Sequence, residues 1–129
     1  MYLMYAGPNE AKASFFESVL YGSDPSKTLV AVTNGYELLC YLQEVKKGEA
    51  YPALIILEMA MPKLAGMETL EFLKADDIYR LIPVLVLYAT ATSNDLDFCE
   101  RLGADCLQQP TSNTTWQALV DQVCDRCAY

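Results

Sequence analysis

Four short runs of consecutive apolar residues recur along the chain, and they constrain its fold more than any other feature. They span residues 1–5, 28–32, 53–57 and 83–88. A run of this length that is apolar at every position is typical of a strand buried on both faces of a parallel sheet. A weaker fifth strand is predicted at 105–108. The chain is therefore expected to build one sheet of five parallel strands.

Apolar residues recur at helical spacing between these runs, so the sequence predicts a helix after each strand. Gly22, Gly48 and Gly103 are predicted to end helices, because glycine commonly follows the last helical turn. Asn34, Ser93 and either Ser112 or Asn113 are predicted to begin them. The helical residues expected to face the core are Ala11, Phe15 and Val19; Leu38, Leu39 and Leu42; Met67, Leu70 and Leu73; Leu96, Cys99 and Leu102; and Trp116, Leu119, Val120 and Val123.

The alternation predicts an α/β fold of the doubly wound (βα)5 type, with residues 1–129 forming a single domain. Crossovers between parallel strands are right-handed and place helices on both faces of the sheet. Ligands bind such sheets outside the carboxyl ends of the strands. Glu58 ends the third predicted strand, so the residues that end the other strands are expected beside it: Ala6, Gly7, Tyr88 and Gln109.

Composition excludes several classes of function. The 129 residues carry a formal net charge of −8, which argues against a nucleic-acid partner. No apolar run approaches the length of roughly 18 residues that a membrane span requires, and the N-terminus lacks the features of a secretion signal. We therefore expect a cytoplasmic protein. Its five cysteines, an odd number, are interpreted as core fillers rather than a disulfide framework.

Three segments resemble the receiver domains of two-component response regulators (CheY-like), and the resemblance covers essentially the whole chain. The strongest is "LIILEMAMPKLAG", in which Glu58, Met61, Pro62 and Gly66 have the family's spacing of acid-x-x-Met-Pro-x-x-x-Gly. "IPVLVLYA" (82–89) is similar to the family's fourth strand, and "LGADCLQQP" (102–110) to its fifth strand and the following proline. "NGYELLCYL" (34–42) also resembles the second helix. The resemblance implies a sheet with strand order 2-1-3-4-5.

The same resemblance implies where a phosphorylation site would lie. In the family, two acids hold magnesium, an Asp accepts a phosphoryl group, a Thr or Ser and a Lys bind that group, and an aromatic residue responds to it. In this sequence the corresponding positions hold Ala6 and Gly7 for the acid pair, Glu58 for the acceptor, Tyr88 for the Thr, Gln109 for the Lys and Cys106 for the aromatic. Every position departs from the family's pattern, so the resemblance implies a degenerate receiver, or pseudo-receiver.

These departures argue against cofactor chemistry. Mg²⁺ requires several oxygen ligands, and Ala6 and Gly7 offer no side-chain oxygen. Glu10 and Asp95 are the other acids that could approach Glu58, but Glu10 is expected in the first turn of a helix, where a carboxylate is already favoured. Without a cation, phosphoryl transfer lacks electrostatic stabilisation. We expect neither Mg²⁺ binding nor enzymatic activity.

Two side chains have alternative interpretations. The Tyr88 ring is expected to pack into the volume left at Ala6 and Gly7; the alternative is that it turns to solvent. Glu58 could imitate a phosphorylated Asp, but a solvated acid at the end of a strand is the favoured interpretation.

Cys124 and Cys127 could form a metal half-site or a redox pair, although the chain contains no histidine and core packing with terminal exposure is favoured.

The predicted function is that of a stand-alone receiver-like protein in two-component (phosphorelay) signalling that acts by protein–protein interaction without phosphorylation. The expected partner is a histidine kinase, another signalling protein or a second copy of the chain. The expected contact face combines the fourth helix, fifth strand and fifth helix, at 95–101, 106–108 and 116–123. The alternatives are a small-ligand sensor that uses the vacated acidic pocket, or a receiver that is still phosphorylated at Glu58.

Overall fold

A computed structural model describes residues 1–45, 49–61, 63–109 and 113–126, except for the side chains of 113–115 and 124–126. Several residues named above fall outside this description. They are Gly48, Pro62, Pro110, Ser112 and Cys127, together with the side chains of Asn113 and Cys124.

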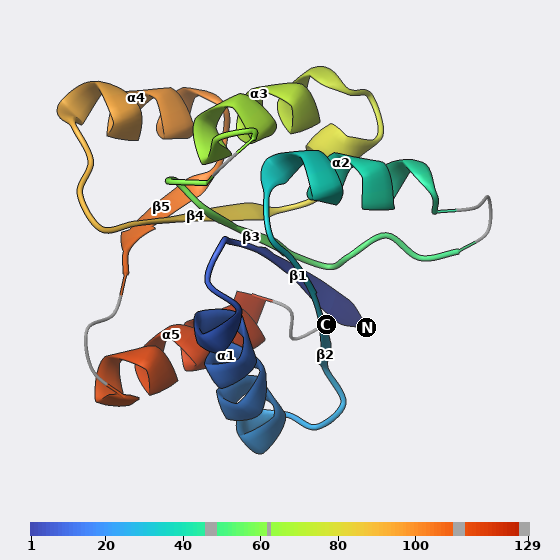
Figure 1. Cartoon of the computed structure of the whole chain (residues 1–129), viewed down its shortest axis with the longest axis vertical. Helices are drawn as coiled ribbons and strands as arrows, with labels where there is room; N and C mark the ends of the chain where they lie inside the picture. Colours follow the sequence, from blue (N-terminus) through green and yellow to red (C-terminus); the bar gives the residue numbers. More distant parts are fainter. Residues whose placement is uncertain (46–48, 62, 110–112, 127–129) are drawn as a thin grey trace.

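Helices and strands alternate along the described chain as predicted (Figure 1). The described residues form a five-stranded parallel sheet with the order β2-β1-β3-β4-β5. The predicted (βα)5 fold and its strand order 2-1-3-4-5 are therefore confirmed. The elements are β1 (Tyr2–Ala6), α1 (Glu10–Ser23), β2 (Thr28–Val32), α2 (Gly35–Gln43), β3 (Ile55–Glu58), α3 (Gly66–Ala75), a short 3₁₀ helix η1 (Tyr79–Leu81), β4 (Val84–Tyr88), α4 (Ser93–Arg101), β5 (Asp105–Gln108) and α5 (Asn113–Arg126).

The helices form one layer on each face of the sheet. Figure 1 shows α1 and α5 on one side and α2, α3 and α4 on the other. Successive strand residues point to opposite faces, so Tyr5 packs with α1 and α5, whereas Ala6 belongs to the cluster covered by the other three helices. Within the described residues, no helix is both long enough and apolar enough to cross a bilayer.

The three central strands match the prediction of burial on both faces, but β2 does not. β1, β3 and β4 are almost entirely buried. β2 lies at the edge of the sheet, where Thr28 and Ala31 are exposed and its other residues are half-buried. The apolar run therefore predicted the position of this strand correctly, but it did not predict that the strand is partly exposed, with a neighbouring strand on one side only.

Local predictions for two helices, α1 and α4, were wrong. In α1 the buried residues are Ala13, Phe16 and Leu20, whereas Ala11 is exposed and the predicted Phe15 and Val19 are half-buried. Apolar residues fill two adjacent stripes of this helix, so their spacing alone does not decide which stripe faces the sheet. Gly22 also lies inside α1, which ends at Ser23.

In α4, Thr92 rather than Ser93 caps the helix, with Asp95 completing a capping box. Leu96, predicted to face the core, is exposed instead.

The connection from β3 to α3 fixes the backbone around Glu58. The Gly66 amide donates to the Met59 carbonyl at 3.1 Å. A Cβ at Gly66 would lie 2.5 Å from the Glu58 carbonyl oxygen and 2.9 Å from the Met59 Cα. Both atoms belong to the backbone, so they cannot move away as a flexible side chain could. Only glycine lets α3 begin this close to the end of β3.

We therefore expect Gly66→Ala to reduce the free energy of unfolding by about 1–3 kcal/mol, the usual range for an overpacked site. Gly22→Ala is the matched control, because Gly22 lies in α1 and a Cβ there would meet no atom within 4 Å. Alanine is the better helix former, so this control should be neutral or more stable by up to about 1 kcal/mol. Urea unfolding of both variants tests the difference, and equal stabilities would contradict the close approach at Gly66.

Candidate functional site

Glu58 is the last residue of β3 and lies inside the molecule. It is 3% exposed, and its neighbour across the sheet is Leu87 in β4. A buried carboxylate is costly unless it is paired and hydrogen-bonded. The favoured interpretation of Glu58 as a solvated acid is therefore wrong, because the interior of the protein supplies its partners.

Lys12 is the ionic partner of Glu58. Its Nζ lies 3.0 Å from Glu58 Oε1, and the Lys12 side chain is 28% exposed. Lys12 stands in the first turn of α1, where Asn9 caps its amide. A cation is disfavoured at this end of a helix by the helix dipole, so the helix alone does not explain why a lysine lies there. The buried Glu58 carboxylate explains it, because it needs a cation as its partner.

Gln109 joins the ion pair from the residue after β5. Its Nε2 donates to Glu58 Oε1 at 2.9 Å, and its Oε1 accepts from Lys12 Nζ at 3.1 Å. The Gln109 amide also donates to the Tyr88 carbonyl at 2.7 Å, which fixes the start of the loop. Lys12, Glu58 and Gln109 thus form a closed hydrogen-bonded triangle that connects α1, β3 and the end of β5. We call it the Lys12–Glu58–Gln109 triangle.

Gly7 provides the space in which the Glu58 carboxylate lies. A Cβ at Gly7 would be 1.7 Å from Glu58 Oε2 and 2.6 Å from its Cδ. Gly7 itself is fixed against the neighbouring strand, since its amide donates to the Val32 carbonyl at 3.0 Å. Any larger residue at position 7 therefore requires the carboxylate to move. The volume vacated at Gly7 holds Glu58.

Tyr5 lies near the Glu58 carboxylate, whose charge acts on its phenol. Both the Tyr5 hydroxyl and Glu58 Oε2 are buried without a hydrogen-bond partner among the described residues. Burial raises the pKa of Tyr5 well above its usual value, and the negative charge of Glu58 raises that pKa further. The phenol therefore stays protonated near a carboxylate whose Oε1 contacts the Lys12 cation.

Tyr88 does not occupy the space beside Gly7. It is half-buried at the end of β4, and the atoms nearest to a Cβ at Gly7 all belong to Glu58. Among the described residues, Lys12 and Gln109 donate hydrogen bonds to the Glu58 carboxylate. The expectation that the Tyr88 ring fills this volume is therefore wrong. The longer glutamate side chain already fills it.

Cys106 lies on the face of the sheet that α4 covers. Its Sγ donates to the Sγ of Cys99 at 3.2 Å, and the Cys99 thiol in turn lies 3.7 Å from the Met67 sulfur. Burial raises the pKa of Cys106 to about 12, so the thiol stays protonated at neutral pH. Of the described cysteines, Cys99 is buried and Cys40 and Cys106 are half-buried. Cys99 and Cys106 agree with the interpretation as core fillers, whereas Cys40 lies outside both core clusters.

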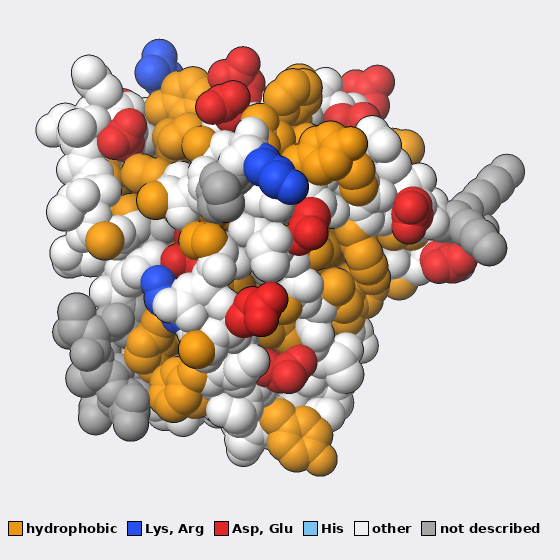
Figure 2. Space-filling view, viewed as in Figure 1, with side chains coloured by type: hydrophobic (Ala, Val, Ile, Leu, Met, Phe, Trp, Pro, Cys, Tyr) orange, Lys and Arg blue, Asp and Glu red, His pale blue; other side chains and the backbone are white. Residues whose placement is uncertain are grey.

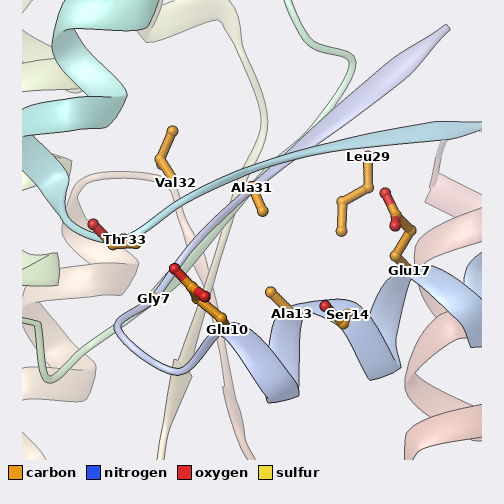
Figure 3. A pocket seen from close by; sticks show the side chains of 9 residues that line it. All are labelled: Gly7, Glu10, Ala13, Ser14, Glu17, Leu29, Ala31, Val32 and Thr33. Atoms are coloured by element: carbon orange, nitrogen blue, oxygen red, sulfur yellow. The ribbon is translucent and has the colours of Figure 1, made fainter.

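A shallow cavity of about 250 Å³ lies next to the triangle, between α1 and β2 (Figure 3). Gly7 lines its inner end, Glu10 and Glu17 contribute carboxylates from α1, and Leu29 contributes apolar surface from β2. Glu58 does not line it. The cavity is smaller than the roughly 300–1,000 Å³ of most small-ligand pockets. The cavity is therefore distinct from the space around Glu58 that the sequence analysis considered as a ligand pocket.

The sequence analysis identified Glu58, Gly7 and Gln109 as neighbours, and the structure brings them together. It did not identify Lys12 or Tyr5. Lys12 carried a usable signal, since a cation in the first turn of a helix is unfavourable unless an acid compensates it. Tyr5 carried none, because an aromatic residue in an apolar strand is ordinary core composition.

The strand order, the helix layers and the buried acid at the end of β3 define a receiver fold. The phosphorylated cyanobacterial phytochrome response regulator RcpA has a TM-score of 0.83 to this structure at 24% identity, covering 96% of this chain and 91% of that one. The Mn²⁺-bound form of response regulator Rcp1 also has a TM-score of 0.83, at 21% identity with the same coverage. These similarities establish the fold.

Two of the curated proteins similar in sequence are response regulators. The polar-differentiation response regulator DivK of Brucella anthropi is 27% identical over 111 residues, which cover 85% of each chain. Response regulator Rcp1 of Synechocystis sp. is 26% identical over 107 residues, covering 81% of this chain and 73% of that protein. No protein-family model matches the chain.

The raised pKa of Tyr5 predicts a loss of stability in alkali. The phenol titrates near pH 10 in the unfolded chain, and the folded protein retains the proton to higher pH. This contribution to stability is therefore complete below about pH 10 and falls as the pH rises above it. We expect Tyr5→Phe to lose less stability than the parent between about pH 9 and about pH 11.

Urea unfolding at several pH values measures this effect. Tyr21→Phe is the control, because the Tyr21 side chain is 64% exposed. The pKa of Tyr2 is also raised, to about 12, but Tyr2 is present in all three proteins and contributes equally. If the three proteins lose stability in parallel, the Tyr5 phenol does not face a buried charge.

Proposed function

We propose that residues 1–129 form a single receiver-like domain that acts in two-component signalling by protein–protein contact, without a phosphoryl switch. The observation that carries the proposal is the Lys12–Glu58–Gln109 triangle, in which a lysine already neutralises the carboxylate at the acceptor position. The receiver fold and the distant response-regulator relatives support the signalling role.

The residues around Glu58 do not fit Mg²⁺, which receiver domains use. Ala6 and Gly7 bring no side-chain oxygen, and Mg²⁺ prefers an octahedron of oxygen ligands. The Lys12 ammonium lies 3.0 Å from Glu58 Oε1, so a cation there would meet a fixed positive charge. Glu58 Oε2 is buried against Gly7 in the interior. We infer that the lysine takes the electrostatic place of a metal.

Phosphorylation of Glu58 is also opposed by its surroundings. A phosphoryl donor must approach an oxygen of the acceptor in line, and this carboxylate is 3% exposed. Glu58 Oε1 is held by both Lys12 and Gln109. The groups that would bind a transferred phosphoryl are replaced by Tyr88 and Gln109, neither of which carries a positive charge. The domain is therefore proposed to keep a single, unphosphorylated conformation at this edge of the sheet.

The partner of such a domain must bind to its surface. We propose a histidine kinase or another signalling protein in the cytoplasm as the partner. A second copy of the chain bound through α4, β5 and α5 is the alternative inferred from the sequence. This role is contact rather than catalysis, because the site offers no activated nucleophile and no fitted metal.

The test is intact mass after incubation with Mg²⁺ and acetyl phosphate. We expect no phosphoryl adduct on the parent and none on Glu58→Asp, because the acid pair and the phosphate-binding lysine are missing in both. A receiver protein that carries the acid pair serves as the positive control. An adduct on the parent that disappears in Glu58→Gln would contradict the proposal and favour a working acceptor.

A further inference from the structure

Large apolar side chains are exposed on the layer formed by α2 and α3. Tyr36 in α2 is 62% exposed and Phe72 in α3 is 59% exposed. Figure 2 shows hydrophobic side chains gathered over this part of the molecule, with acidic side chains around them. A contiguous apolar patch with a polar rim is characteristic of an interaction site.

The two helices enclose a groove of about 590 Å³. We call it the α2–α3 groove. From α2 it is lined by a stripe of residues at i, i+3, i+4 and i+7 spacing, which begins at Tyr36 and ends at Gln43. This stripe is separate from Leu38 and Leu42, which face the core. The complete lining is Tyr36, Leu39, Cys40, Gln43, Lys63, Leu64 and Phe72.

Leu38 and Leu42 attach α2 to the sheet, and of the groove stripe Leu39 also packs against this core, whereas Tyr36 is exposed. Leaving Tyr36 and Phe72 in water forgoes a burial energy on the order of 1.5–3 kcal/mol for each side chain. The face made by α4, β5 and α5 differs, since its exposed large apolar residue within the described chain is Leu96, at 36%. The apolar surface therefore favours the α2–α3 groove over the face expected from the sequence.

The charges around the groove define its occupant. Glu37, Glu68 and Glu71 are exposed on the two helices. Lys63 is the cation that lines the groove, whereas the Lys74 ammonium contacts the carbonyl oxygens of Arg80 and Ile82. The whole chain carries a net charge of −8. A second copy would bring acids against acids, which costs free energy at an interface.

We propose that the α2–α3 groove binds an amphipathic helix of a partner protein, with an apolar face seated between Tyr36 and Phe72 and Lys or Arg residues flanking it. A helix laid in a groove between two helices buries its apolar face in this way. The proposal rests on the proposed function in one respect, that the domain acts by contact. It assigns the contact to a surface other than the one inferred from the sequence.

Two residues that line the groove lie on the connection between β3 and α3. Lys63 and Leu64 belong to the connection that leaves Glu58 and leads to α3. Lys63 has a φ of 64°, in the left-handed region that non-glycine residues rarely adopt. A bound helix would therefore contact the backbone segment that the buried Glu58 helps to position.

The probe is a synthetic helical peptide of roughly 15 residues with leucine at i, i+3, i+4 and i+7 positions and lysine elsewhere. A peptide with glutamate in place of lysine is its charge control. Binding is measured by fluorescence anisotropy of the labelled peptide. Tyr36→Ala and Phe72→Ala are the groove variants, and Tyr21→Ala on α1 is the matched control, since Tyr21 is similarly exposed at 64%.

We expect the lysine peptide to bind the parent and the glutamate peptide to fail. Each groove variant should weaken binding by about 10-fold or more, as for the central residues of an interface. Tyr21→Ala should bind like the parent, and backbone amide shifts should move in α2 and α3. The thermal midpoints of the groove variants should match the parent because both side chains are exposed, so lost binding cannot be attributed to unfolding.

Three results would overturn the proposal. The first is no binding by the lysine peptide, or equal weakening by Tyr21→Ala, which would indicate nonspecific attraction to an acidic surface. The second is a set of amide shifts confined to α4 and β5. The third is a parent that sediments as a dimer and dissociates on Phe72→Ala, which would assign the groove to a second copy. None of these results depends on the phosphorylation test, so the two proposals fail separately.

Discussion

The structure at the carboxyl edge of the sheet depends on one interaction, the buried ion pair between Lys12 and Glu58. A carboxylate that is 3% exposed requires a compensating charge, and the lysine provides it at 3.0 Å. The neighbouring residues follow from this requirement. Gly7 leaves room for the carboxylate, and Gln109 donates to the same oxygen that accepts from the lysine. The Tyr5 phenol remains neutral near this carboxylate.

This interaction also determines what the fold can do. A receiver fold places an acid at the end of β3, where the strands of a doubly wound sheet bind their ligands. Here a side chain of the same protein satisfies that acid from α1, so the place of an exchangeable ligand is taken by a fixed charge. Under the proposed function the receiver fold serves as a binding surface, and the exposed apolar residues on α2 and α3 are the contact proposed for it.

The fold was predictable from the sequence because its signals are local and repeated. The apolar runs marked four of the five strands of the described sheet, and Asn34 was correctly predicted to cap α2. The strand order 2-1-3-4-5 placed β2 at the edge of the sheet, but the partial exposure of β2 was missed because its apolar run resembles that of a central strand. The phase of α1 was missed for a similar reason, since packing of Phe16 against Tyr5 selects one of two apolar stripes.

The site was less predictable because its chemistry depends on contacts between distant residues. Lys12 and Glu58 are 46 positions apart, and Lys12 and Gln109 are 97 apart. Comparison with the family's pattern located the residues that had changed, Gly7 and Gln109 among them. It did not locate the residue that compensates for those changes, because Lys12 lies outside the pattern. The expectation that the Tyr88 ring fills the space beside Gly7 was wrong because Glu58 itself occupies that space.

The most direct test is a double-mutant cycle that combines Lys12→Met with Glu58→Gln, read as free energies of unfolding in urea. If the buried pair holds this edge together, each single change leaves an unpaired group. The coupling energy should then be about 1–3 kcal/mol. The double variant should lose less unfolding free energy than the two single variants lose in total. Lys12→Met combined with Glu71→Gln, on the exposed surface of α3, should show no coupling. Additivity within about 0.5 kcal/mol for Lys12 and Glu58 would contradict the pair.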